Sequence, residues 1–82
     1  MPKQDKSTKK LYEGQLKKFG ENVAEYRKKL GMTQLELAFG AKLTLSYVSK
    51  IESGKMNPSL MWIVSLAKAL KVSVNKLLKD LE

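Results

Sequence analysis

A short stretch near the middle of the chain gathers side chains that can donate hydrogen bonds to a polyanion. Ser46, Ser49, Lys50 and Ser53 recur within three helical turns, and no bulky acidic side chain is expected on their outer face. Lysine can donate to phosphate oxygens and to guanine O6 or N7, and serine can pair with several base edges. The set favours contact with nucleic acid, although a solvated surface remains the plainer interpretation of any single lysine.

The composition argues against most other chemistry. The 82 residues include no histidine and no cysteine, which removes the commonest general base and the thiolate ligands of metals. We find no acid–base pair and no glycine-rich phosphate loop, so we expect no catalysis, no metal site and no cofactor. No apolar run approaches the ~20 residues of a membrane span, and no secretory signal is present. A cytoplasmic protein is expected.

The net charge points to the same kind of partner. Sixteen Lys and Arg residues against eight Asp and Glu residues leave a charge of +8, which favours nucleic acid first and an acidic membrane surface second. With 43% hydrophobic residues, a chain of this length can bury one modest core. We disfavour a membrane-surface helix because the apolar stripes are needed for that core.

The pattern predicts an all-α fold with one folded domain at residues 13–82. Residues 1–12 are expected to form a flexible basic arm, because they carry four lysines and few apolar residues. Capping and periodicity signals predict five helices and no strand. The expected helices span residues 15–30, 34–41, 45–53, 59–70 and 74–80.

Each expected helix carries an apolar stripe at helical spacing. The stripe of the first helix comprises Leu16, Phe19, Val23, Tyr26 and Leu30. The third helix turns Val48 and Ile51 inward. The fourth is expected to bury Leu60, Ile63, Leu66, Ala67 and Leu70, and the fifth presents Val74, Leu77, Leu78 and Leu81.

Residues that cap helices stand at the expected boundaries. Gly31 is suited to a left-handed C-cap after the first helix. Thr33 and Glu36 have the spacing of a capping box, and Thr44 can cap the third helix. Ser59 and Ser73 are expected to cap the fourth and fifth helices in the same way.

Two very short helices separated by about three residues have the spacing of a helix-turn-helix. The residues within and after them strengthen that interpretation. The segments TQLELA (33–38), LTLSYVSKIESG (43–54), NPSL (57–60) and LAKAL (66–70) together resemble the phage-repressor (Cro/C1, or Xre-type) helix-turn-helix family, over about residues 19–78.

This resemblance implies a five-helix, lambda-repressor-like domain whose third helix enters the major groove of double-stranded DNA. It implies base reading by Leu45, Ser46, Ser49 and Lys50. The positions that it assigns to phosphates are Gln34, Lys42, Thr44, Tyr47, Ser53, Lys55 and Asn57. It also implies that Gln34 braces the recognition helix.

Two positions depart from the family's pattern. Lys42 occupies a turn position where the family often has glycine, so a left-handed backbone there would cost on the order of 1 kcal/mol. Leu45 stands where related domains place a longer polar side chain, and its apolar surface favours a thymine methyl group.

The chain has fifteen lysines and a single arginine, Arg27, at the position where the family carries an arginine facing the glutamate of its Ile-Glu-x-Gly signature. Glu52 is that glutamate here. Only a guanidinium binds a carboxylate in bidentate fashion, so we predict a largely buried Arg27–Glu52 ion pair.

The sequence therefore favours a small, sequence-specific transcription regulator, most simply a repressor. We expect a homodimer formed through the apolar stripe of the last helix, with Trp62 as a further candidate. An antitoxin-like or other protein-interaction module is the alternative. Met61 and Trp62 favour it, because they fall outside the buried stripe of the fourth helix. Trp62 could instead lie over Leu11 and Tyr12.

Overall fold

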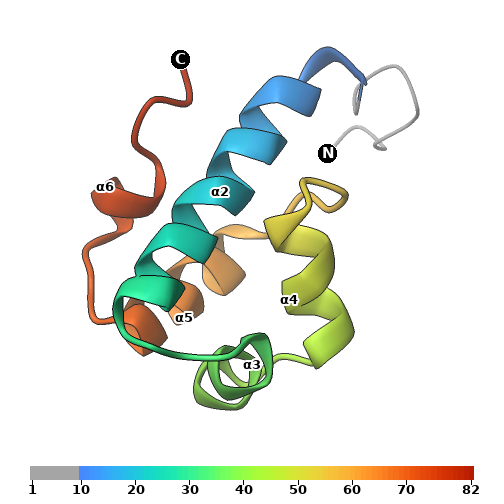
Figure 1. The fold of residues 1–82 in the computed structure, drawn as a ribbon. Helices are drawn as coiled ribbons and strands as arrows, with labels where there is room; N and C mark the ends of the chain where they lie inside the picture. Colours follow the sequence, from blue (N-terminus) through green and yellow to red (C-terminus); the bar gives the residue numbers. More distant parts are fainter. Residues whose placement is uncertain (1–9) are drawn as a thin grey trace.

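The computed structural model describes residues 10–82, and over that range it contains five helices and no strand (Figure 1). The helices are α2 (Glu13–Lys29), α3 (Gln34–Ala41), α4 (Leu45–Glu52), α5 (Leu60–Leu70) and α6 (Val74–Leu77). The predicted all-α class is confirmed. Residues 1–9 of the predicted basic arm lie outside the described residues, and Lys10 and Leu11 are already helical.

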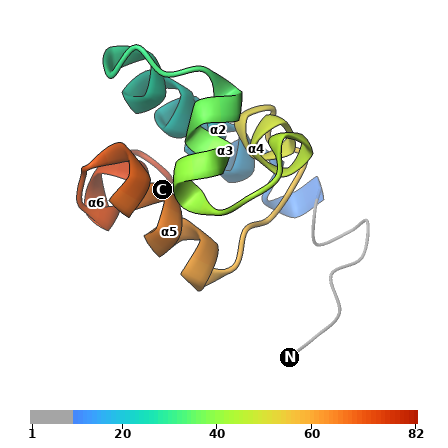
Figure 2. The same ribbon diagram turned by 90° about the horizontal axis from the view of Figure 1, so that it is seen from below.

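The longest helix, α2, runs along the molecule, with α4 on one side of it and α6 on the other (Figure 1). Seen from below, α3 lies between α4 and α5 and contacts both of them (Figure 2). Each of the five helices contributes to one core. Its largest fully buried side chains are Val23, Leu37, Val48, Ile51, Leu66, Leu70 and Leu77. In the part of the chain described, none of the helices is both long and apolar enough to cross a membrane.

The two helices of the central motif begin where their capping residues predicted. The Thr33 hydroxyl accepts from the Glu36 backbone N–H at 3.0 Å, and the Glu36 carboxylate accepts from the Thr33 backbone N–H at 2.8 Å. This reciprocal pair is the predicted capping box. The Thr44 hydroxyl accepts from the Tyr47 N–H at 3.1 Å and so starts α4 three residues after α3 ends.

Two glycines allow α4 and the turn after it to lie directly against α2. A Cβ atom on Gly20 would overlap the carbonyl oxygen of Ile51 and come within 2.7 Å of that of Glu52. A Cβ atom on Gly54 would lie 2.8 Å from the Lys17 Cα. The backbone of α2 therefore sets the position of the C-terminal end of α4.

Left-handed residues end three of the helical segments. Gly31 follows α2 with φ of 70°, as its residue type predicted. Lys42 caps α3 at φ 59° and ψ 41°, and Lys71 caps α5 at φ 59° and ψ 38°. The backbone at Lys42 is thus of the kind that disfavours a residue with a Cβ atom.

Several predicted packing details are wrong. Leu30 and Leu60 are exposed, at 47% and 69%, where burial was expected. Both stand at a helix end: Leu30 is the C-cap of α2, and Leu60 is the first residue of α5. The stripe continues past the edge of the core at these positions, and near the start of α5 Pro58 is buried.

The last helix is shorter than the predicted range 74–80 and ends at Leu77. Ser73 is its N-cap residue, but its side chain makes no capping hydrogen bond, contrary to the prediction. Further along, Asp80 is left-handed, with φ of 62°, and the side chain of Asn22 donates to the carbonyls of Leu77 and Lys79, both at 2.9 Å. These tertiary bonds give the Leu77 and Lys79 carbonyls, which no helix continues to satisfy, a hydrogen-bond donor from α2.

Candidate nucleic-acid interface

The outer face of α4 carries the residues predicted to read bases. Val48 and Ile51 turn into the core, which fixes the rotation of α4 about its axis. The side chains of Leu45, Ser46, Ser49 and Lys50 are left exposed on the other faces of the helix. This face presents one apolar surface, two small hydroxyls and one long cation.

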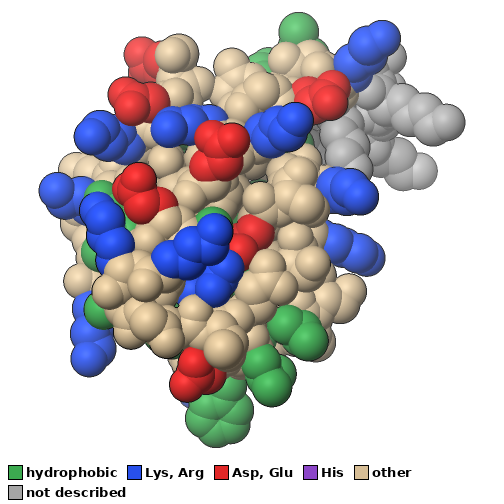
Figure 3. Space-filling view, in the orientation of Figure 1, with side chains coloured by type: hydrophobic (Ala, Val, Ile, Leu, Met, Phe, Trp, Pro, Cys, Tyr) green, Lys and Arg blue, Asp and Glu red, His purple; other side chains and the backbone are tan. Residues whose placement is uncertain are grey.

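Most of the residues predicted to contact phosphates lie in the segments directly before and after α4. Lys42 and Thr44 lie in the turn before α4, whereas Lys55 and Asn57 lie in the loop after it, and all four are exposed. Lysine side chains line the edge of the molecule over α4 and this loop (Figure 3). Ser53, the C-cap of α4, is exposed, and its hydroxyl donates to the Lys50 carbonyl at 3.2 Å.

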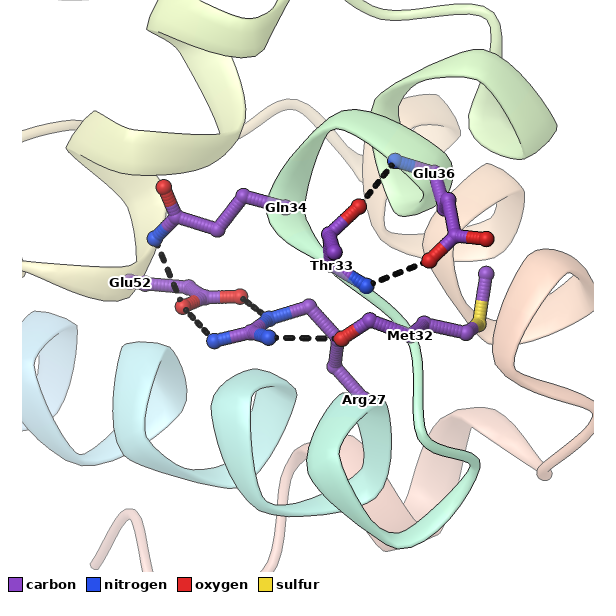
Figure 4. Close-up of polar contacts among 6 residues, drawn as sticks. All are labelled: Arg27, Met32, Thr33, Gln34, Glu36 and Glu52. Atoms are coloured by element: carbon purple, nitrogen blue, oxygen red, sulfur yellow. Dashed lines mark hydrogen bonds and ion pairs between the residues drawn. The ribbon is translucent and has the colours of Figure 1, made fainter.

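A charged network joins the end of α4 to α2 (Figure 4). Arg27 Nε donates to Glu52 Oε2 at 2.6 Å, and Arg27 Nη2 donates to Glu52 Oε1 at 3.0 Å. The two side chains are only 11% and 7% exposed. The structure thus brings together the two residues paired by sequence analysis, in bidentate geometry.

Two further contacts complete this network. Arg27 Nη1 donates to the Met32 carbonyl at 2.8 Å, which ties the turn before α3 to the ion pair. Gln34 Nε2 donates to Glu52 Oε1 at 2.9 Å, so the first residue of α3 braces the last residue of α4. The hydrogen bond to Glu52 raises the pKa of Arg27; burial opposes this rise, and the attraction of the carboxylate adds to it.

Tyr47 lies on the side of α4 toward α5, where its ring contacts Trp62. The two ring centroids are 5.6 Å apart, and the ring planes are inclined by 58°. Burial raises the pKa of Tyr47. Leu11 and Tyr12 were the residues expected under Trp62, and the structure places Tyr47 against its ring instead.

Two polar side chains that the sequence did not single out, Asn22 and Ser65, hold the scaffold around this surface. Asn22 is 6% exposed and carries the two bonds to the C-terminal segment described above. A polar residue between the apolar positions Phe19 and Val23 of α2 was the available signal. The Ser65 hydroxyl donates to the Ala41 carbonyl at 2.7 Å and ties α5 to the end of α3. No local pattern pointed to that bond.

Large apolar side chains also remain on the surface beside the motif. Leu35 and Phe39 are 62% and 87% exposed and lie one turn apart on α3. Apolar side chains project at the edge of the molecule over α3 (Figure 3). Leu60 and Met61, at the start of α5, are each 69% exposed.

Two short helices joined by a tight turn, with the second helix braced from α2 and α3 and its outer face open, define a helix-turn-helix domain. A sequence profile described as "Helix-turn-helix" matches residues 23–77. The chain belongs to this family, in its Cro/C1 (Xre) type.

The relatives are named as regulators. The chain is 34% identical over 65 residues to the HTH-type transcriptional regulator DdrOP3 of Deinococcus deserti, an alignment that covers 79% of this chain and 50% of that protein. It therefore spans about half the length of that relative. It is 43% identical over 61 residues to the control protein C.BamHI of Bacillus amyloliquefaciens, covering 73% of this chain and 75% of that one.

A solved structure has the same architecture. The restriction-modification controller protein C.AhdI from Aeromonas hydrophila superposes with a TM-score of 0.77 at 41% identity, covering 78% of this chain and 97% of that chain. The predicted five-helix helix-turn-helix fold is confirmed by this likeness and by the helices themselves.

Proposed function

We propose that this chain regulates transcription by binding a specific double-stranded DNA site, with α4 in the major groove. The observation that carries the proposal is the outer face of α4, where Leu45, Ser46, Ser49 and Lys50 are exposed on a helix whose rotation is fixed by the core. Lys50 reaches guanine O6 or N7, Ser46 and Ser49 pair with several base edges, and Leu45 contacts a thymine methyl group.

The neighbouring segments would bind the two phosphate strands. Lys42, Lys55 and Asn57 stand on both sides of α4 along the chain, and the N-terminal amides of α3 and α4 add donors at the positive ends of helix dipoles. The remaining members of this proposed phosphate set are Gln34, Thr44, Tyr47 and Ser53. Such contacts hold the register of the domain on DNA without reading sequence.

The regulator is proposed to be a repressor that binds as a homodimer. One small domain contacts few bases, and a two-fold pair reads two half-sites about one helical turn apart. Leu77 is fully buried and unavailable for pairing, so we assign the contact to Leu78, which is 38% exposed, together with the half-buried Val74 and Leu81. Sedimentation of Leu78→Asp beside the wild type, with and without DNA, tests this assignment.

Selection of bound duplexes from a random DNA pool tests the main proposal. We expect an enriched site with two-fold symmetry and half-sites about one helical turn apart. A pool that is retained but not enriched for any sequence would contradict sequence-specific binding. We propose that the chain meets its double-stranded DNA site in the cytoplasm and that it catalyses no reaction there.

A protein-interaction module is the second candidate, favoured by the exposure of Met61 next to Trp62. Apolar side chains at the start of a helix can anchor a partner protein. This function predicts DNA affinity without sequence preference. The same selection therefore separates the two candidates.

A further inference from the structure

One aromatic contact joins the first turns of α4 and α5. Tyr47 and Trp62 are each the third residue of their helix, and the backbone N–H of each donates to the hydroxyl of its N-cap residue, Thr44 or Ser59. The caps hold both backbones, and the rings meet at a centroid distance of 5.6 Å. This distance is within the range of favourable aromatic pairs, and the inclination of 58° lies between the offset-stacked and the edge-to-face arrangement.

Within residues 10–82, the hydroxyl of Tyr47 makes no hydrogen bond to the protein. It is not among buried polar atoms that lack a partner, so it is open to solvent. The ring itself is half-buried, and burial raises the pKa of the Tyr47 phenol, a group that is already neutral near neutral pH. A neutral phenol is an O–H donor, as a phosphate oxygen requires.

Trp62 is 38% exposed, which is too open for a core residue. The Trp62 ring lies against Tyr47 of α4, whereas α5, the helix that carries Trp62, packs mainly on α3 and α6. An aromatic side chain on a helix surface samples more than one χ1 rotamer unless a neighbour restricts it. The indole is the neighbour that restricts Tyr47 on its α5 side.

We propose that Trp62 is a positioning residue for DNA binding, which holds the Tyr47 ring so that its hydroxyl donates to a backbone phosphate. This inference rests on the proposed function, because it assumes that α4 sits in the groove. Trp62 itself need not touch DNA. Fixing the rotamer before binding removes an ordering cost that the complex would otherwise carry.

A double-mutant cycle on the selected duplex tests this role. The four proteins are the wild type, Tyr47→Phe, Trp62→Ala and the double variant, with unfolding measured for each so that binding is compared among folded chains. We expect each single change to weaken binding about three- to tenfold, the range of one neutral hydrogen bond. In the Tyr47→Phe background, Trp62→Ala should add little, because no hydroxyl remains to be positioned.

Two controls separate positioning from packing or charge. Met61→Ala removes a neighbouring exposed side chain on α5 and should leave binding unchanged, whereas Trp62→Phe keeps a ring and should retain most of the affinity. The salt dependence of binding should be the same for Tyr47→Phe and the wild type, since a neutral donor displaces no counterion.

The outcomes are distinct. Loss from Trp62→Ala that is equal in both Tyr47 backgrounds, or no loss in either, overturns the positioning role and leaves the proposed function standing. A wild-type chain that binds no duplex preferentially overturns both. Coupling between the two substitutions, with the salt dependence unchanged, supports the proposal.

Discussion

The guanidinium of Arg27 binds both oxygens of the Glu52 carboxylate, at 2.6 and 3.0 Å, so one bidentate ion pair fastens the last turn of α2 to the end of α4. Gln34 donates to the same carboxylate from the start of α3. Side chains of α2 and α3 therefore converge on Glu52, so these contacts hold the C-terminal end of α4 in place.

Arg27→Ala should lower the free energy of unfolding by about 3–5 kcal/mol, because it leaves the Glu52 carboxylate buried without its ionic partner. Urea unfolding measures the change. Lys28→Ala, at an exposed position next in the chain, is the matched control and should stay within about 0.5 kcal/mol of the wild type. Equal effects of the two changes would mean that the pair does not support the fold.

Gly20→Ala should destabilise the protein by roughly 1–3 kcal/mol, because the new methyl group would overlap the carbonyls of Ile51 and Glu52 and force α4 away from α2. Gly14→Ala lies on the same helix with nothing within 4 Å of its Cβ position, so it should be neutral or stabilise by up to about 1 kcal/mol. Thermal unfolding of both variants makes the comparison. Equal stability of the two variants would mean that α4 does not depend on the close approach of α2 at Gly20.

Lys42→Gly and Lys71→Gly should each stabilise the fold by about 1 kcal/mol, since both lysines occupy nearly the same left-handed conformation. Their effects on DNA binding should differ. Both remove one positive charge, but only Lys42 lies in the turn before α4, so only Lys42→Gly should weaken binding and reduce the salt slope by about one unit. Identical binding by the two variants would remove Lys42 from the phosphate set.

Lys50→Ala should weaken binding to the selected site by about 1–3 kcal/mol and relax preference at one base pair. Lys55→Ala, in the loop after α4, should instead weaken all sequences alike and reduce the salt slope by about one unit. Titrations of specific and random duplexes at several salt concentrations distinguish the two patterns. A uniform loss from both variants would show that α4 does not read bases.

Local signals predicted most of the helices and their starts. Thr33, Thr44 and Ser59 begin helices because a short side chain bonds an amide two or three residues ahead, an interaction that needs no other part of the chain. The inward pair Val48 and Ile51 followed from helical spacing in the same way. Spacing alone therefore predicts the candidate base-reading face, since it is the remainder of a helix whose buried side is known.

Contacts between distant segments depended on the assembled fold. Trp62 meets Tyr47, Asn22 holds the carbonyls that end α6, and Leu60 is exposed although it continues the stripe of α5. Each depends on where a second helix lies, and periodicity describes only the helix that carries it. The Arg27–Glu52 contact could be anticipated because resemblance to a family supplied the long-range information that local spacing lacks. The same resemblance implied that Gln34 braces the helix that ends at Glu52. The tight approach at Gly20, in contrast, was decided by the way α2 and α4 pack together, because burial leaves each polar atom and each backbone only the partners that tertiary packing brings within reach.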